Sequence, residues 1–90
     1  MKLTEDKLIE CEFKYLDYNT HDKKIFKPPL MKHVCNNLYH IRISDYSNHI
    51  SREWYCHIDN EDFETIAGVS IDTIEQFNDL MKLMDIDYRI

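Results

Sequence analysis

The sequence has very little glycine or proline and no long apolar segment. Its 90 residues include one glycine, Gly68, and two prolines, Pro28 and Pro29. Dinucleotide fingerprints, Walker loops and nucleophile elbows each need several glycines at fixed spacing, so the sequence excludes all three. The longest stretch without a formal charge has nine residues, 33–41, whereas a bilayer span needs roughly 20 apolar residues. The N-terminal residues MKLTEDK contain no apolar signal core. We therefore expect a soluble intracellular protein.

The three cysteines, Cys11, Cys35 and Cys56, are an odd number, which argues against a disulfide framework. Free cysteines usually pack as small hydrophobic residues, and this is the expectation for all three. A structural zinc is the alternative, with ligands from His33-x-Cys35 and Cys56-His57. Neither pair has the common ligand spacing, and Cys56 and His57 would point to opposite faces of a strand. We expect no cofactor.

A chain of 90 residues forms one domain, here residues 1–90, with a small core. Its clearest element is a helix over residues 70–84, where apolar residues recur at helical spacing. Ser70 suits the N-cap, and Val69 and Ile74 have the spacing of a hydrophobic staple. Residues 86–90 alternate between apolar and polar and predict a short terminal strand.

A hairpin is the second clear element. Residues 38–43 and 50–58 alternate in the way that marks half-buried strands, and a polar loop joins them. Tyr39, Ile41 and Ile43 share one face of the first strand, and Trp54, Cys56 and Ile58 share one face of the second.

The N-terminal region admits two interpretations, a helix over 4–11 capped by Thr4 or a strand from Ile9 onward. We place the change from helix to strand at 11–13, with a strand to about Leu16 and another at 24–27. The proline pair predicts a loop or a sheet margin. Together these elements predict an α+β fold, in which a small antiparallel sheet of three to five strands packs against one C-terminal helix and a short N-terminal helix precedes it.

The formal net charge of −6 is unevenly distributed along the chain. Residues 1–57 contain nine basic and eight acidic side chains, whereas residues 58–90 contain two basic and nine acidic ones. The acidic third predicts a protein-binding surface that competes for a basic groove. Its candidate residues are Asp59, Glu61, Asp62, Glu64, Asp72, Glu75 and Asp79. Acidity that only keeps a small domain soluble is the alternative.

The opposite charge gathers near the proline pair. A basic segment of Lys23, Lys24, Lys27 and Lys32, interleaved with aromatic residues, would suit a nucleic-acid-binding module. The net negative charge opposes this alternative, because phosphate repels the acidic third.

We expect no enzymatic activity. Cys35 has only His33 and Lys32 beside it in sequence to activate a thiolate. Asp59 and Asp62 suit the capping of a turn, together with Asn60, better than acid–base chemistry.

The order of motifs resembles that of a group of small proteins from Bacteroidetes genomes, prophages and mobile elements. Members carry a segment like L-T-x-x-x-L-x-x-x-G-F, then a hairpin, then a tryptophan strand that runs into H-I-D-N-x-D-F-x-T-I. The matching stretches here are 3–13 and 54–66, followed by a helix at 74–84. Where the group has glycine before the phenylalanine, this chain has Glu12. If that position is left-handed, glutamate costs about 1 kcal/mol relative to glycine.

This resemblance implies an accessory protein of a phage or mobile element, located in the bacterial cytoplasm, and it supplies no catalytic residues. It implies a protein partner, with a host defence complex that handles nucleic acid as one class. A homodimer is also expected, because small sheets leave edges and an apolar patch of Tyr15, Tyr18, Phe26 and Tyr46 would be exposed.

Overall fold

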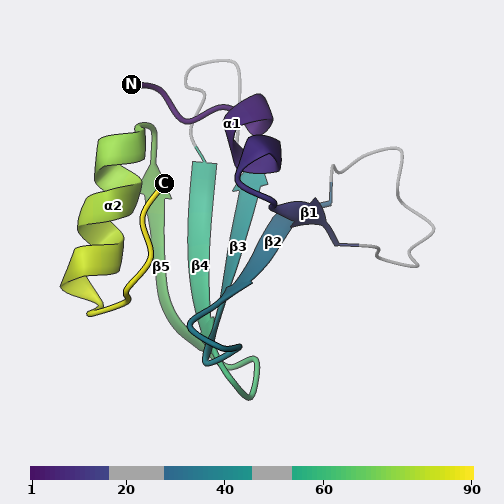
Figure 1. Ribbon diagram of the computed structural model, residues 1–90, viewed down its shortest axis with the longest axis vertical. Coiled ribbons are helices and arrows are strands. Elements are labelled where there is room, and N and C mark those ends of the chain that lie inside the picture. The colour runs from purple at the N-terminus through teal and green to yellow at the C-terminus, as the bar shows by residue number, and fades with distance from the viewer. Residues whose placement is uncertain (17–27, 46–53) are drawn as a thin grey trace.

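The computed structural model describes residues 1–16, 28–45 and 54–90 and contains two helices and five strands. Along the chain these are α1 (Glu5–Glu10), β1 (Lys14–Tyr15), β2 (Leu30–Val34), β3 (Tyr39–Asp45), β4 (Trp54–Asn60), β5 (Thr65–Ile71) and α2 (Ile74–Leu83) (Figure 1). The strands form one antiparallel sheet in sequence order, so β1 and β5 are its edges. The predicted α+β fold is therefore confirmed.

The predicted hairpin corresponds to β3 and β4. Ile41 pairs with Ile58 and Ile43 pairs with Cys56, and all four side chains are completely buried. Leu8 of α1 and two residues of α2, Phe77 and Met81, belong to the same core cluster. Both helices therefore cover one face of the sheet, and we call the other face the open face. Alternation places His40 and Arg42 of β3, with His57 and Asp59 of β4, on this open face.

Of the two interpretations of the N-terminal region, the helix is the one that the structure shows, as α1. The side chain of Thr4 caps α1 by accepting a hydrogen bond from the backbone N–H of Lys7 at 3.1 Å. The change to strand β1 occurs at Glu12, whose φ of 69° lies in the left-handed region. After β1, the N–H of Leu16 donates to the carbonyl oxygen of Pro29 at 2.9 Å, so the proline pair lies at the sheet margin, as predicted.

The C-terminal helix begins four residues later than the sequence predicts. Thr73, not Ser70, is the N-cap of α2, and it forms a capping box with Gln76. Ser70 instead lies in β5 and pairs with Tyr55. The start of α2 is fixed further by the N-terminal segment, because the N–H of Ile74 donates to the carbonyl oxygen of Met1 at 2.9 Å.

Two strands of the sheet were not predicted, β2 and β5. The turn from β2 to β3 contains Asn36 and Asn37, both at positive φ. A type I′ hairpin turn requires positive φ at its two central residues, and asparagine tolerates that conformation. The β5 segment, TIAGVSI, is uncharged and rich in β-branched residues, which favours a strand. Val69 and Ser70 also satisfy the local rules for starting a helix, so the local pattern at this end of β5 is ambiguous.

The remaining predictions fall at the tail and in a region the structure does not describe. Residues 86–90 form no strand; instead Ile86 is buried in the core and the backbone of Ile90 bonds to the side chain of Asn78. The strand expected at 24–27 lies outside the described residues. Within the described ranges, no helix is both long and apolar enough to cross a membrane.

Glu12 offers a direct test of the α1–β1 connection. Glu12→Gly should increase the free energy of unfolding by about 1 kcal/mol, because glycine tolerates the left-handed conformation that glutamate adopts at a cost. The ion pair with Lys32, at 4.0 Å and largely exposed on the Glu12 side, is expected to offset little of this gain. Urea unfolding with an unchanged m-value is the measurement.

Glu10→Gly is the matched control, because Glu10 is exposed and lies in the last position of α1. There glycine should destabilise by roughly 1 kcal/mol, or less at a helix end. If both variants lose stability to the same extent, the left-handed strain at Glu12 is not relieved by glycine and the prediction is wrong.

Candidate functional site

Three predicted site residues lie together at the turn between β4 and β5. Glu61, Asp62 and Glu64 are exposed, and their carboxylates make no hydrogen bond or ion pair within the described part of the chain. Asn60 shapes this turn, because its side-chain oxygen accepts from the backbone N–H groups of Asp62 and Glu64 at 2.9 and 3.0 Å. The amide of Asn60 therefore caps the turn, and the three carboxylates are left facing solvent.

Two further predicted residues lie at the other end of β5. Asp72 directly follows the strand, and its carboxylate is 3.8 Å from the ammonium of Lys2. Glu75, in the first turn of α2, binds the N-terminal amine at 2.8 Å. Hydrogen bonding from this amine lowers the pKa of Glu75. Asp79, one turn further along α2, is exposed and makes no ion pair with the described residues.

Asp59 does not belong to this exposed surface. Its side chain is only 3% exposed and accepts two hydrogen bonds from Arg42, at 2.7 and 3.2 Å, and one from the hydroxyl of Thr65 at 2.8 Å. Burial opposes ionisation of the carboxyl, but the hydrogen bonds from Arg42 and Thr65 outweigh it and hold the pKa of Asp59 below its usual value. Arg42 lies 17 residues away in sequence, so the pairing could not be predicted from the local pattern.

The open face also gathers aromatic and imidazole rings. His40 is 3% exposed, stacks on Phe63 with centroids 4.1 Å apart, and shares a hydrogen bond between Nδ1 atoms with His33. Next to this group, the rings of Tyr55 and His57 lie 4.6 Å apart. Two buried nitrogens, Nε2 of His40 and Nδ1 of His57, have no hydrogen-bond partner among the described residues. Local sequence patterns do not predict this cluster, because the residues come from three strands and a turn.

The open-face charges make stability depend on pH. Burial, reinforced by the charge of Arg42, lowers the pKa of His57 below 6.5, although Asp59 opposes this shift. As the pH falls, the unfolded chain therefore protonates His57 at a higher pH than the folded protein does. The free energy of unfolding consequently decreases below about pH 6.5. Asp59 is an acid with a lowered pKa, so its ionised form stabilises the folded protein above pH 3.8. This contribution to the free energy of unfolding is lost as the pH falls through the lowered pKa of the folded state.

The measurement for this prediction is the urea midpoint of the protein and of His57→Ala at pH 7.5 and pH 5.5. The difference in midpoint between the two pH values should be smaller in His57→Ala. Comparison of the two proteins at both pH values isolates the contribution of His57. An identical pH dependence in both proteins would contradict the assigned shift.

The residues of the zinc alternative are separated by the sheet. Cys56 is buried in the core, whereas His57 lies on the open face, as the alternation predicts. Cys35 is half-buried in the β2–β3 turn, and His33 is engaged with His40. Across residues 1–16, 28–45 and 54–90, no three metal-ligating side chains of histidine, cysteine, aspartate or glutamate come close enough to hold an ion.

The three thiols should differ in reactivity. Burial raises the pKa of Cys56 to about 12, so at pH 8 only about 10⁻⁴ of this thiol is ionised. Cys11 and Cys35 are half-buried. Titration of the native protein with a disulfide reagent should therefore modify Cys56 at least about 100-fold more slowly than the other two.

Cys56→Ala is the control, because it should remove the slow phase and leave the fast ones. Modification of all three thiols at one rate in the native protein would show that Cys56 is accessible.

The basic segment is only partly described. Lys23, Lys24 and Lys27 lie outside the described residues. The ammonium of Lys32 donates to the carbonyl oxygen of Cys11 at 2.7 Å and lies 5.2 Å from the ring centre of Tyr88. Its charge is thus engaged within the protein, and the one described lysine of the four does not present a free cation to phosphate.

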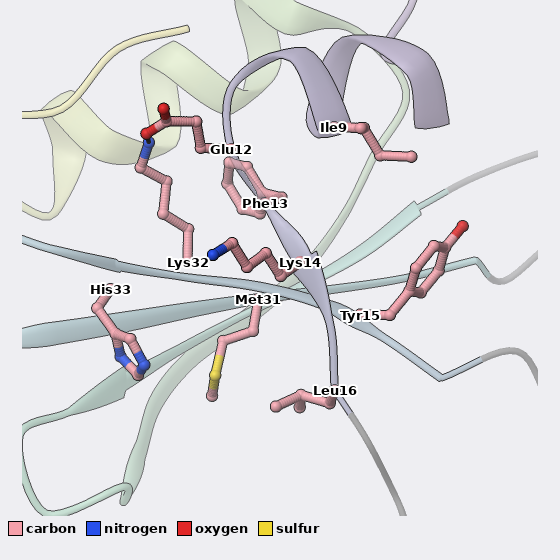
Figure 2. A pocket seen from close by; sticks show the side chains of 9 residues that line it. All are labelled: Ile9, Glu12, Phe13, Lys14, Tyr15, Leu16, Met31, Lys32 and His33. Atoms are coloured by element: carbon pink, nitrogen blue, oxygen red, sulfur yellow. Dashed lines mark ion pairs between the residues drawn. The ribbon is translucent and has the colours of Figure 1, made fainter.

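A hollow of about 650 Å³ lies where α1, β1 and β2 meet. Figure 2 shows Lys32 and Glu12 on one side of β2, with Met31 and His33 on the other. Ile9, Tyr15 and Leu16 add apolar lining. The hollow borders residue 16, where the described part of the chain breaks off, and we assign it no function.

The remaining feature of the surface is the edge strand β5. Five of its seven residues are exposed, and the two that are not are Ala67 and Ile71. Among the described residues β5 pairs only with β4. An uncharged edge strand thus lies between the carboxylates of the β4–β5 turn and those at the start of α2. We call Glu61, Asp62, Glu64, Asp72 and Glu75 the acidic flanks of β5.

Comparison of the chain with protein-family models, with curated proteins and with solved structures found no match.

Proposed function

We propose that this chain is a non-enzymatic accessory protein of a phage or mobile element that acts by binding another protein through its acidic C-terminal third. The observation that carries the proposal is the placement of the acidic flanks at both ends of an exposed strand. Complementary charges steer partners and select orientation, while exposed strand backbone supplies contacts of its own.

The contacts of the carboxylates support this choice of surface. The three at the β4–β5 turn make no ion pair with the described residues, so binding a basic partner there would break no ion pair within the described part of the chain. Asp72 and Glu75 make ion pairs that are largely exposed to solvent, and such pairs contribute little to stability. A host complex with a basic groove, of the kind that handles nucleic acid, is the class of partner that fits this charge.

The test uses two double variants of equal net charge. Asp62→Lys with Glu64→Lys changes the acidic flanks, and Asp6→Lys with Glu10→Lys changes α1, which lies at the opposite end of the sheet from the β4–β5 turn (Figure 1). Each reversal adds two positive charges, so both variants have a formal net charge of −2 instead of −6. Tagged proteins are expressed in the native cell, and captured proteins are quantified by mass spectrometry.

A partner recovered with the unmodified protein should fall at least tenfold with the flank variant and remain unchanged with the α1 variant. Capture should also weaken as salt is raised, because exposed charges are screened. Circular dichroism and urea unfolding check that both variants fold. Equal recovery with the two variants would refute binding through the acidic flanks.

A further inference from the structure

Among the described residues, the outer edge of β5 shows none of the features with which soluble proteins protect an edge strand. Natural edges carry lysine or proline, are short, or are covered by another segment. β5 has seven residues without charge or proline, and Ile66 and Val69 are 45% and 40% exposed. Helix α2 lies beside β5 (Figure 1), yet most of the strand remains exposed. Within the described ranges no backbone hydrogen bond joins this outer edge to another segment.

The turn before β5 holds an apolar side chain in an unfavourable backbone conformation. Phe63 has a φ of 62° and is 61% exposed. A bulky residue is strongly disfavoured in the left-handed region, and such strain clusters at functional sites. The stacking of Phe63 on His40 holds its ring on the open face, two residues before the first residue of β5.

The acidic flanks decide which occupant suits this edge. A second copy pairing antiparallel about Gly68 would place Glu64 of one copy opposite Asp72 of the other, at both ends of the new ladder. Like charges directly opposite each other in a sheet are destabilising. An extended segment with lysine or arginine at its ends would instead meet a carboxylate at each end and an uncharged strand between them.

We infer that β5 accepts, as a sixth strand of the sheet, an extended segment of a partner protein with an uncharged, β-branched centre and basic ends. This inference rests on the proposed function and specifies the partner's chemistry at the same surface. Main-chain hydrogen bonds to the edge would supply affinity, and the flanking charges would supply specificity and orientation.

The probe is a synthetic peptide with seven alternating valine and threonine residues and two lysines at each end. Two matched peptides serve as controls: one has glutamates at the ends, and the other has N-methylated amides throughout its centre. Binding to the full chain is measured by fluorescence anisotropy, and the site is located by amide hydrogen exchange. The lysine peptide should bind at least tenfold more tightly than either control and should slow exchange in β5.

Two proline variants test the edge from the side of the protein. Successive residues of a strand direct their N–H groups to opposite edges, so one of Val69→Pro and Ser70→Pro removes an outward donor and the other removes a bond to β4. The variant that keeps the urea midpoint should lose peptide binding at least tenfold. If both variants unfold, the difference in binding between the lysine peptide and the N-methylated peptide still tests whether main-chain hydrogen bonds to β5 are formed.

Three outcomes overturn the inference. The first is equal binding of the lysine and N-methylated peptides, and the second is peptide-induced protection from hydrogen exchange outside β5. The third is protection of β5 in the peptide-free protein at concentrations where light scattering shows a dimer. The last outcome would identify a second copy as the occupant. Loss of native-partner capture by the Asp62→Lys, Glu64→Lys variant, without peptide protection of β5, leaves the proposed function standing and removes only this inference. Peptide protection of β5 with unchanged capture removes the proposed function instead.

Discussion

The pairing of β3 with β4 is the constraint on which the rest of this structure depends. Ile41 opposite Ile58 and Ile43 opposite Cys56 form the buried centre, onto which Phe77 and Met81 of α2 pack. A slip of one residue in this register would turn every side chain to the other face. Either Arg42 of β3, or His57 and Asp59 of β4, would then enter the core and lose the partner that compensates the charge on the open face. The register is therefore specified from both faces of the sheet at once.

The open face depends on this register in turn. Correct pairing places Arg42 opposite His57, and Asp59 lies two residues further along β4 on the same face. The guanidinium can therefore donate two hydrogen bonds to the carboxylate of Asp59. The β-bulge between Ile58 and Asp59 then brings Thr65 of β5 opposite Asp59. A buried carboxylate with three hydrogen bonds has a structural role, because removing one partner would leave the other charge uncompensated.

The acidic third therefore divides into two structurally different parts. Asp59 joins the sheet, whereas the acidic flanks remain at the surface around β5. The flanks at the start of α2 also anchor the N-terminal segment through Met1 and Lys2. Those of the β4–β5 turn make no such contact within the described residues. Exposed carboxylates without an ion pair to a described residue thus lie at one end of an exposed edge strand.

The sequence by itself determined the elements whose local signals agree with one another. Alternation identified the β3–β4 hairpin and the division of its faces, and the capping residue Thr4 with the left-handed Glu12 bounded α1. The apolar stripe identified α2, and the charge count located the acidic third. These features depend on neighbours within a few residues, so they can be read from the chain alone.

The tertiary structure decided the features for which local signals conflict or are silent. Val69 and Ser70 suit either a helix start or a strand, and only the pairing of Ser70 with Tyr55 of β4 selects the strand. Asp59 resembles an exposed turn residue until Arg42, from another strand, covers it. The edge position of β5 depends on the order of all five strands. Each outcome depends on long-range contacts whose free energy exceeds local propensity. For that reason the sequence located the acidic third of the chain, whereas only the fold showed that the acidic flanks lie at the two ends of the edge strand β5.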